Sequence, residues 1–557
     1  MSRLRNGLAL SLLSMTLGLI SGCNEAPAPK PTASESSVKN ADRPINAAHA
    51  TDSDDNQDAP PPVVLTSNDQ PKSDAKNSTA KNSTAKKTAA DKPFFDGWNK
   101  PALTLVLSGE QHGYFEPCGC AEKQSGGMSR RHDLVKQIQA KGWPVAGLDL
   151  GGVVNRSRAQ SKLKFQTFLA AMKDTRYSVL NLGPEELKLG AADLLAFHAN
   201  DPKDPLGSIG FVSANVTLFG SPDLGTPIRS KVLTLGKHKV GVTSVLGASF
   251  RKEIAPEGAN VDITIDDPAK SLPDVIKELQ SQKPDLLVLL SHGTLAEGKA
   301  LAKQFPQFEI VMSSGGSEDP EFDNPLKLDS TLFVQVGHKG KFTGVVGFFP
   351  EDSQNRLRFE LIKLTEDRFQ ESQKMVEHMR LYQDLLKESA LAESEPPIKH
   401  FSGAKFVGTK VCAECHTKAF AVWEKSGHAH AYDSLIKGRP ELKDRWVSRI
   451  YDPECLSCHV TGWHAQDVLR YTSGFESKAK TPHLLHNGCE NCHGPGSRHI
   501  QLIDAGDKVA ANKEVRVTLA EAKKSLCVTC HDLDNDPKIT SATFDAKWEK
   551  IKHVGRD

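Results

Sequence analysis

The chain has 557 residues, and its 70 lysine and arginine side chains almost balance its 69 aspartate and glutamate side chains. Nucleic-acid binding relies on an excess of basic groups, so a net charge of +1 gives no reason to expect a nucleic-acid partner. The length leaves room for more than one hydrophobic core.

The first residues have the features of an export signal. Arg3 and Arg5 precede an apolar run from Leu8 to Ile20 that is too short to span a bilayer, which predicts a signal peptide over residues 1–22. The run ends at Ile-Ser-Gly-Cys23, which resembles the lipobox of bacterial lipoproteins. That resemblance implies lipidation of Cys23 and a membrane-anchored lipoprotein on the periplasmic or cell-surface side. The alternative is an ordinary cleaved signal with an incidental cysteine.

Residues 23–95 are rich in Ala, Pro, Ser, Asn, Asp and Lys, and the pentapeptide Lys-Asn-Ser-Thr-Ala occurs at 76 and again at 81. Such a segment cannot bury enough apolar surface to offset the entropy lost on ordering. We expect a disordered linker that tethers the folded part to the membrane.

Residues 96–365 alternate short β-rich runs with helical patterns, which predicts an α/β domain of packed sheets covered by helices. The expected strands are Leu103–Leu107, Val145–Leu150, Phe211–Asn215, Val240–Val245, Leu286–Leu290, Glu309–Met312, Leu332–Val336 and Val345–Phe349. The expected helices include Ser129–Ala140, Leu163–Met172 and Leu295–Gln304.

Polar or glycine-rich loops follow several of these strands, where open α/β folds place their sites. They contain Glu110-Gln-His112-Gly, Asp149-Leu-Gly-Gly152, Asn181-Leu-Gly-Pro-Glu185 and Ser291-His292-Gly. Their order resembles the 5'-nucleotidase branch of the calcineurin-like metallophosphoesterases, and the resemblance implies the metallophosphoesterase-like sandwich fold.

The chain departs from that family at most metal positions. Glu110 stands where the family has Asp, Gly152 replaces the bridging Asp, and Pro184-Glu185 replaces Asn-His. Ser314-Gly-Gly replaces the terminal histidine motif. A two-metal phosphoesterase needs its shared carboxylate to clamp the attacking and leaving oxygens, so we expect the fold without the hydrolase.

Two alternatives stay open for this domain. A single divalent metal could be held by Glu110, His112 and His292, with Glu185 as a fourth candidate. The chain would then be a metal-dependent phosphoesterase or nucleotidase with an accessory electron carrier. Separately, Cys118 and Cys120 precede Arg130-Arg131 and could be low-pKa thiolates, a strained disulfide or two small buried residues.

Residues 366–400 predict a helical connector. Glu366 to Ala392 alternates charged and apolar residues at helical spacing, and Pro396-Pro397 ends the pattern. We expect this helix to join two domains or to pack against one of them.

Residues 401–557 contain four copies of Cys-x-x-Cys-His. The two thiols of such a motif add to the vinyl groups of a haem and the histidine ligates its iron, so we predict four covalently bound haem c groups. Structural zinc on the cysteine pairs is the alternative, but it requires no fixed histidine. The predicted haem-binding residues are Cys412, Cys415, His416, Cys455, Cys458, His459, Cys489, Cys492, His493, Cys527, Cys530 and His531.

The same region resembles the cytochrome c-554 and c-prime group. The resemblance rests on the first motif with Trp423 and His428, on Cys458-His-Val-Thr-Gly-Trp463, and on the third motif continuing to His499. It implies a mainly helical, loop-rich multihaem domain. It also implies His499 as the distal ligand of the first haem, His428 of the third and His553 of the fourth, with no strong distal ligand at the second.

Haems ligated by two histidines have no open site and pass electrons. We therefore expect a membrane-anchored tetrahaem cytochrome that carries electrons between redox partner proteins, with a non-catalytic phosphoesterase-like domain. The alternative function is a haem enzyme that acts on a small nitrogen or sulfur oxide at a five-coordinate second haem.

Overall fold

The computed structural model describes residues 93–117, 124–198, 209–256, 262–320, 325–438, 442 and 445–555. The predicted signal peptide, Cys23 and most of the linker lie outside the described residues, as do Cys118 and Cys120. Residues 87–557 belong to one compact unit. Within the described ranges, no helix has both the length and the apolar character that a membrane span requires.

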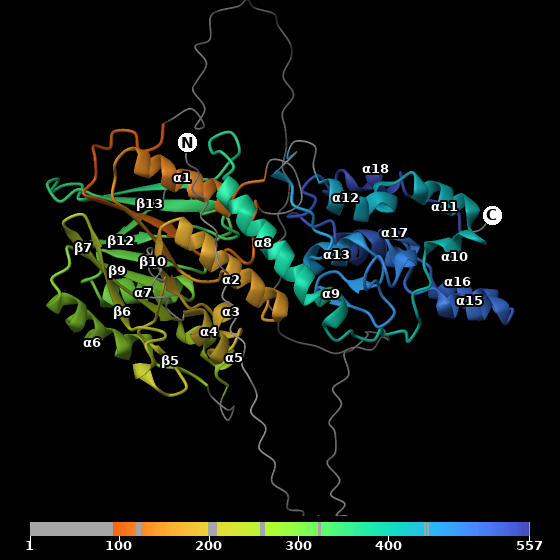
Figure 1. The fold of residues 1–557 in the computed structure, drawn as a ribbon, viewed down its shortest axis with the longest axis horizontal. Coiled ribbons are helices and arrows are strands. Elements are labelled where there is room, and N and C mark those ends of the chain that lie inside the picture. The colour runs from red at the N-terminus through yellow and green to blue at the C-terminus, as the bar shows by residue number, and fades with distance from the viewer. Residues whose placement is uncertain are drawn as a thin grey trace, which may run out of the picture. The chain divides into compact units, whose positions relative to one another are not determined.

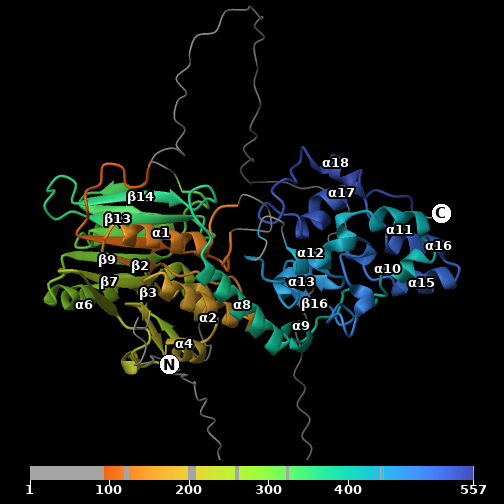
Figure 2. The same ribbon diagram turned by 45° about the horizontal axis from the view of Figure 1, so that its top comes forward.

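Two sheets of six strands each form the α/β domain (Figures 1 and 2). In spatial order, the first sheet consists of β14 (Leu357–Lys363), β13 (Phe342–Phe348), β1 (Leu103–Ser108), β2 (Val145–Asp149), β3 (Tyr177–Asn181) and β4 (Gly210–Val212). The second consists of β11 (Leu326–Leu328), β12 (Thr331–Val334), β10 (Ile310–Ser313), β9 (Leu286–His292), β7 (His238–Leu246) and β6 (Ser230–Leu235).

The central strands of each sheet are parallel. β1, β2, β3 and β4 run parallel in the first sheet, and β7, β9, β10 and β12 in the second. Their carboxyl ends therefore lie along one edge of each sheet, and the loops that follow them gather there. A smaller pair joins β5 (Val216–Leu218) to β8 (Ile263–Ile265).

The strands are apolar on both faces because each sheet is covered on both sides. In β1, Leu105 and Leu107 pack between the two sheets, where they belong to the same apolar cluster as Val288 and Met312 of the second sheet. Val106 points to the opposite face and joins the cluster under the helices. The result is a sandwich of two sheets between two helical layers.

Helices cover the outer faces. The first sheet is covered by α1 (Met128–Ala140), α2 (Ala159–Asp174) and α8 (Gln373–Ser389), and the second by α6 (Pro268–Ser281) and α7 (Leu295–Gln304). The shorter helices of this domain are α3 (Pro184–Leu187), α4 (Ala191–His198) and α5 (Arg251–Ile254).

The predicted connector is divided in two. The helical pattern from Glu366 to Ala392 becomes α8 and α9 (Leu391–Ser394), and the chain breaks at Ala390, whose φ is 48°. The apolar face of α8 packs on α1 and α2 through Met375, Met379 and Tyr382. The connector therefore contributes to the core of the α/β domain.

The C-terminal region is helical, as expected, with short elements and long loops. Its helices are α10 (Thr409–Ala413), α11 (Thr417–Glu424), α12 (Ala431–Lys437), α13 (Pro453–His459), α14 (Cys489–His493), α15 (Ser497–Asp504), α16 (Lys508–Glu514), α17 (Leu519–Glu521) and α18 (Phe544–Trp548). One short hairpin pairs β15 (Trp463–His464) with β16 (Leu469–Arg470). A single small apolar cluster, around Leu456, Trp463 and Phe475, is buried within it.

Polar contacts join this region to the α/β domain. The buried Asp452 carboxylate accepts hydrogen bonds from the amides of Gln160 (2.7 Å) and Gln383 (3.0 Å). Glu454, two residues on, forms ion pairs with Lys164 and Arg156. These contacts lie directly before the second Cys-x-x-Cys-His motif and fix its position against α2 and α8.

Candidate haem sites and a candidate metal centre

Local helical structure presents each cysteine motif. The second motif lies in α13, where Asp452 caps the helix by accepting from Glu454 N at 3.1 Å, and the third motif is α14. On a helical turn, residues spaced by three and four share one face, so both thiols and the imidazole of a motif point to the same side. All eight cysteines of the four motifs are free thiols.

Three histidine pairs have the spacing of two axial ligands on one iron. The ring centroids of His416 and His499 are 6.2 Å apart. Those of His428 and His531 are 5.9 Å apart, and those of His493 and His553 are 5.8 Å apart. Two imidazoles that bind opposite sides of a metal, each through a bond of about 2.0 Å, have centroids on the order of 6 Å apart. The side chains therefore fit haem iron at three motifs.

Two of these pairs differ from the sequence-based assignment. His428 was expected at the third haem and His553 at the fourth, but His428 lies against His531 of the fourth motif and His553 against His493 of the third. The partners are exchanged because the packing of distant loops decides which histidine faces which motif. His499 lies at the first motif, as expected.

Hydrogen bonds at Nδ1 prepare several of these rings for ligation through Nε2. His493 Nδ1 donates to Val515 O (2.7 Å), His499 Nδ1 to Ala511 O (2.9 Å) and His459 Nδ1 to Ala431 O (2.7 Å). A carbonyl oxygen only accepts, so the ring nitrogen must be the donor, and the other nitrogen keeps its lone pair for a metal.

His531 has a different partner. Its Nδ1 lies 3.0 Å from Asp536 Oδ2, and Lys547 Nζ contacts the same carboxylate at 3.0 Å. A carboxylate makes an imidazole ligand more basic than a carbonyl does. The fourth motif therefore carries the most electron-rich proximal histidine of those whose Nδ1 contacts are described above.

His459 of the second motif lacks a second imidazole. In the described part of the chain, no histidine ring faces it as in the three pairs, although His531 is near enough to help burial lower the pKa of His459. A cavity of about 1280 Å³ is lined by residues of the second, third and fourth motifs, including His459, His493, His531 and Trp463.

Cysteines of different motifs are close neighbours. Cys412 of the first motif is hydrogen-bonded to Cys489 of the third, and Cys458 of the second to Cys530 of the fourth. Burial, reinforced by Cys527 and Cys530, raises the pKa of the Cys492 thiol to about 12. The attachment sites therefore adjoin in the order first, third, fourth, second.

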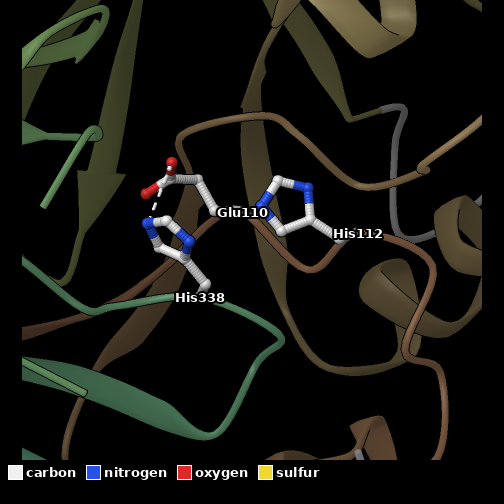
Figure 3. A group of neighbouring side chains, drawn as sticks. All are labelled: Glu110, His112 and His338. Atoms are coloured by element: carbon white, nitrogen blue, oxygen red, sulfur yellow. Dashed lines mark ion pairs between the residues drawn. The ribbon is translucent and has the colours of Figure 1, made fainter. Parts of the chain in front are cut away.

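A second group of side chains lies at the carboxyl ends of the strands in the α/β domain. Atoms of Glu110, His112 and His338 that could bind a metal all lie within 4.8 Å of one another (Figure 3). Glu110 Oε1 is 3.4 Å from His338 Nε2, and the imidazole rings of His112 and His338 are 5.5 Å apart. Burial raises the pKa of Glu110 to about 7 and lowers that of His112 to about 4.

His292 was expected in this group, and the structure puts His338 there instead. His292 is buried, its Nδ1 donates to Leu150 O at 3.0 Å, and burial lowers its pKa to about 4. Glu185, the fourth candidate, is close enough to raise the pKa of Glu110, and its Oε2 is buried without a hydrogen-bond partner.

Sequence reasoning missed His338. It lies in Gly337-His-Lys-Gly340, just after β12, which runs parallel to β10. The rule that identified Glu110 and His112, namely polar residues after a buried parallel strand, would also have identified it.

Packing explains why carboxylates are missing beside this group. A Cβ at Gly152, whose φ is 73°, would lie 3.1 Å from Glu110 Cα and 3.4 Å from the His292 ring. The nearby Asp149 carboxylate is engaged by Ser108, by Gln111 Nε2 (2.6 Å) and by Gly151 N (2.9 Å). The position of the shared ligand is therefore filled by backbone, and Asp149 serves the loop.

Together these features define a class: a phosphoesterase-like α/β domain followed by a c-type cytochrome domain. Residues 411–494 match the family described as cytochrome c554 and c-prime, so this region is a cytochrome of that family and binds haem c covalently. The match includes the first three motifs and ends before Cys527.

Individual relatives agree with this division. Over 143 residues the chain is 33% identical to cytochrome c-554 from Nitrosomonas europaea, which covers 23% of the chain and 58% of that protein. Over 193 residues it is 23% identical to snake venom 5'-nucleotidase from Crotalus adamanteus, which covers 34% of the chain and 31% of that protein. The N-terminal domain is thus similar to the 5'-nucleotidases in sequence as well as in its strand order.

Among solved structures, a 5'-nucleotidase precursor from Thermus thermophilus is 22% identical with a TM-score of 0.44, covering 55% of this chain and 61% of that one. The calcineurin-like phosphoesterase YfkN from Bacillus subtilis is 14% identical with a TM-score of 0.42, covering 52% of this chain and 98% of that one. The chain spans just over half of the curated cytochrome and about a third of the curated nucleotidase.

Proposed function

We propose that the chain is a membrane-anchored tetrahaem c-type cytochrome that relays electrons between redox partner proteins. The observation that carries the proposal is the set of three histidine pairs whose rings are 5.8 to 6.2 Å apart. Haem held between two imidazoles exchanges single electrons and has no open coordination position for a substrate.

The contacts between motifs support a relay. Cys412 touches Cys489, Cys492 is near Cys527 and Cys530, and Cys530 touches Cys458. Residues that attach neighbouring cofactors are thus in direct contact, which keeps each transfer distance short. The protein holds the attachment sites in one continuous series, and its two ends are the first and second motifs.

The α/β domain is proposed to be non-catalytic as a phosphoesterase. Gly152 leaves no space for a shared carboxylate, and Asp149 is fully engaged by its own loop. A hydrolase that needs two ions would lack their common ligand. Manganese-, zinc- or cobalt-supported hydrolysis of phosphate esters by the full chain, abolished by His112→Ala, would contradict this part of the proposal.

The cellular location is proposed from the sequence alone. Arg3, Arg5 and the apolar run to Ile20 favour export, and Cys23 is the proposed site of the lipid anchor. Two or more acyl chains on one residue hold a protein stably on a membrane. Metabolic labelling with a radioactive fatty acid should mark the native chain and leave Cys23→Ser unlabelled.

A second candidate function concerns the second motif. His459 has no facing histidine ring in the described residues and lines the 1280 Å³ cavity together with Trp463. An open iron position there would bind a small nitrogen or sulfur oxide. Nitric oxide should then change the spectrum of one haem in four, and entirely low-spin iron in the oxidised protein would exclude this function.

The haem number tests the main proposal. Mass spectrometry of the purified exported chain should show four haems, and Cys527→Ala with Cys530→Ala should leave three. The fourth motif is the informative one, because the family match ends before it. A native chain with zinc on its cysteine pairs, or with three haems, would overturn the proposal.

A further inference from the structure

The cluster formed by Glu110, His112 and His338 combines two imidazoles with one carboxylate. This donor set, when it leaves other positions open, is typical of mononuclear iron(II) centres and suits divalent first-row transition metals in general. Ligand atoms bound to one such ion at about 2.1 Å are at most about 4.2 Å apart. The atoms here lie within 4.8 Å of one another, so small side-chain movements would bring them to one ion.

Orphaned polar atoms point to a missing cation. His338 Nε2 and Glu185 Oε2 are buried, and neither has a hydrogen-bond partner. Leaving buried polar groups unpaired costs about 1–3 kcal/mol each, which an ion would recover. The backbone is strained at the same place, because Glu110 and His112 both have a φ of 47°, a left-handed conformation that is uncommon outside glycine.

Both ligand segments are fastened to the loop of the fourth motif. Lys339 follows His338, and its Nζ lies 2.7 Å from Asp534 Oδ2. Tyr114 is two residues beyond His112, and its hydroxyl donates to the same Oδ2 at 2.7 Å. Asp534 lies in the segment that begins at His531 and continues to Asp536, the carboxylate that accepts from His531 Nδ1.

We propose that Glu110, His112 and His338 bind one divalent first-row transition-metal ion, iron(II) by class, and that this ion is coupled to the fourth haem through Asp534. The metal half of the proposal is independent of the haems, whereas the coupling half rests on the proposed cytochrome function. A cation beside this loop favours the less positive, reduced form of the neighbouring haem. Coupling between two sites is reciprocal, so reduction must strengthen metal binding by the same factor by which the metal favours reduction.

Manganese(II) serves as the probe for the binding half, because its free ion has a distinct room-temperature EPR signal. The full-length holoprotein should bind one manganese ion per chain. Glu110→Gln and His338→Gln should each lower the affinity at least about tenfold, whereas His132→Gln, at a histidine whose Nδ1 lies against Ser372 Oγ, should not change it. Haem content and circular dichroism establish that each variant is folded, and His112→Gln replaces either variant that is not. Absence of binding, or binding unchanged in the ligand variants, would overturn the site.

The coupling half is tested by comparing manganese affinity in oxidised and dithionite-reduced protein. Reduction should increase the affinity on the order of fivefold or more, the usual lower range of such couplings. Asp534→Asn should retain binding in the oxidised protein and bring the ratio towards one. Asp274→Asn, an exposed aspartate in α6, should leave the ratio unchanged. Equal affinities in the two redox states of the native protein would refute the coupling, and a protein without haem would refute the cytochrome function while the binding measurement still stands.

Discussion

The α/β domain and the cytochrome domain fill their interiors in different ways. In the α/β domain, three apolar clusters pack between the sheets and under the helices, and side chains as large as Phe165 and Phe168 are fully buried. In the cytochrome domain, one small cluster lies beside a cavity of about 1280 Å³ lined by cysteine and histidine side chains. Side chains complete the first interior, whereas the second depends on its cofactors.

The largest expected effect tests that dependence directly. Cys489→Ala combined with Cys492→Ala should remove one haem and destabilise the cytochrome domain by on the order of 4 kcal/mol or more, because loss of a bound cofactor belongs to the severe class of changes. Intact-mass spectrometry gives the haem number, and the Soret band followed during thermal unfolding gives the stability. Retention of four haems, or an unchanged melting curve, would contradict the contrast between the two domains.

The opposite perturbation concerns the domain that side chains fill. Phe165→Ala in α2 should destabilise the α/β domain by about 3–5 kcal/mol through the cavity it leaves, with no change in haem number. Guanidinium denaturation followed by far-ultraviolet circular dichroism measures the change. Leu381→Ala, at a position 60% exposed on α8, is the matched control and should cost little. If both variants lost the same stability, burial in this domain would not be what stabilises it.

The boundary between the domains should show an intermediate effect. Asp452→Ala leaves the amides of Gln160 and Gln383 without their buried acceptor, at a cost of about 1–3 kcal/mol. The Soret and far-ultraviolet transitions should separate in this variant if the contact couples the domains. Asp467→Ala, where the side chain is 65% exposed, should keep them as they are in the native protein.

The smallest effect is a pH dependence in the α/β domain. His198 Nε2 accepts from Phe211 N at 3.3 Å, so the ring must be neutral, and burial lowers its pKa. A lowered pKa in the folded state contributes stability that is complete above the unfolded value of about 6.5 and is lost as the pH falls below it. Between pH 6.5 and 5 the slope from this group stays under about 1.4 kcal/mol per pH unit. Denaturation curves of His198→Gln should show a shallower dependence, and an identical slope would argue against this origin.

The sequence predicted what local patterns control. Apolar runs identified most central strands, and α7 begins and ends at the predicted residues Leu295 and Gln304. β3 and β14 were missed, and in β14 charged residues interrupt the apolar pattern of an edge strand. The cysteine motifs are local as well, so the haem-attachment residues could be predicted from the chain itself.

What could not be predicted depends on contacts between distant segments. No local pattern tells which motif His428 or His553 will face, because each lies in a segment of its own that tertiary packing places. His338 was overlooked for a related reason, since it joins Glu110 only when the ends of both sheets meet. Pairing between segments, rather than the identity of individual residues, limits what can be inferred from this sequence.

The exchanged histidine pairs have a consequence for biogenesis. Each pair joins a residue to one that emerges much later from the export machinery: His499 after His416, His531 after His428 and His553 after His493. A partly translocated chain can therefore receive haem on its early cysteines and still lack the sixth ligand for that iron. High-spin colour in such a chain would mark it as unfinished until the remaining polypeptide arrives.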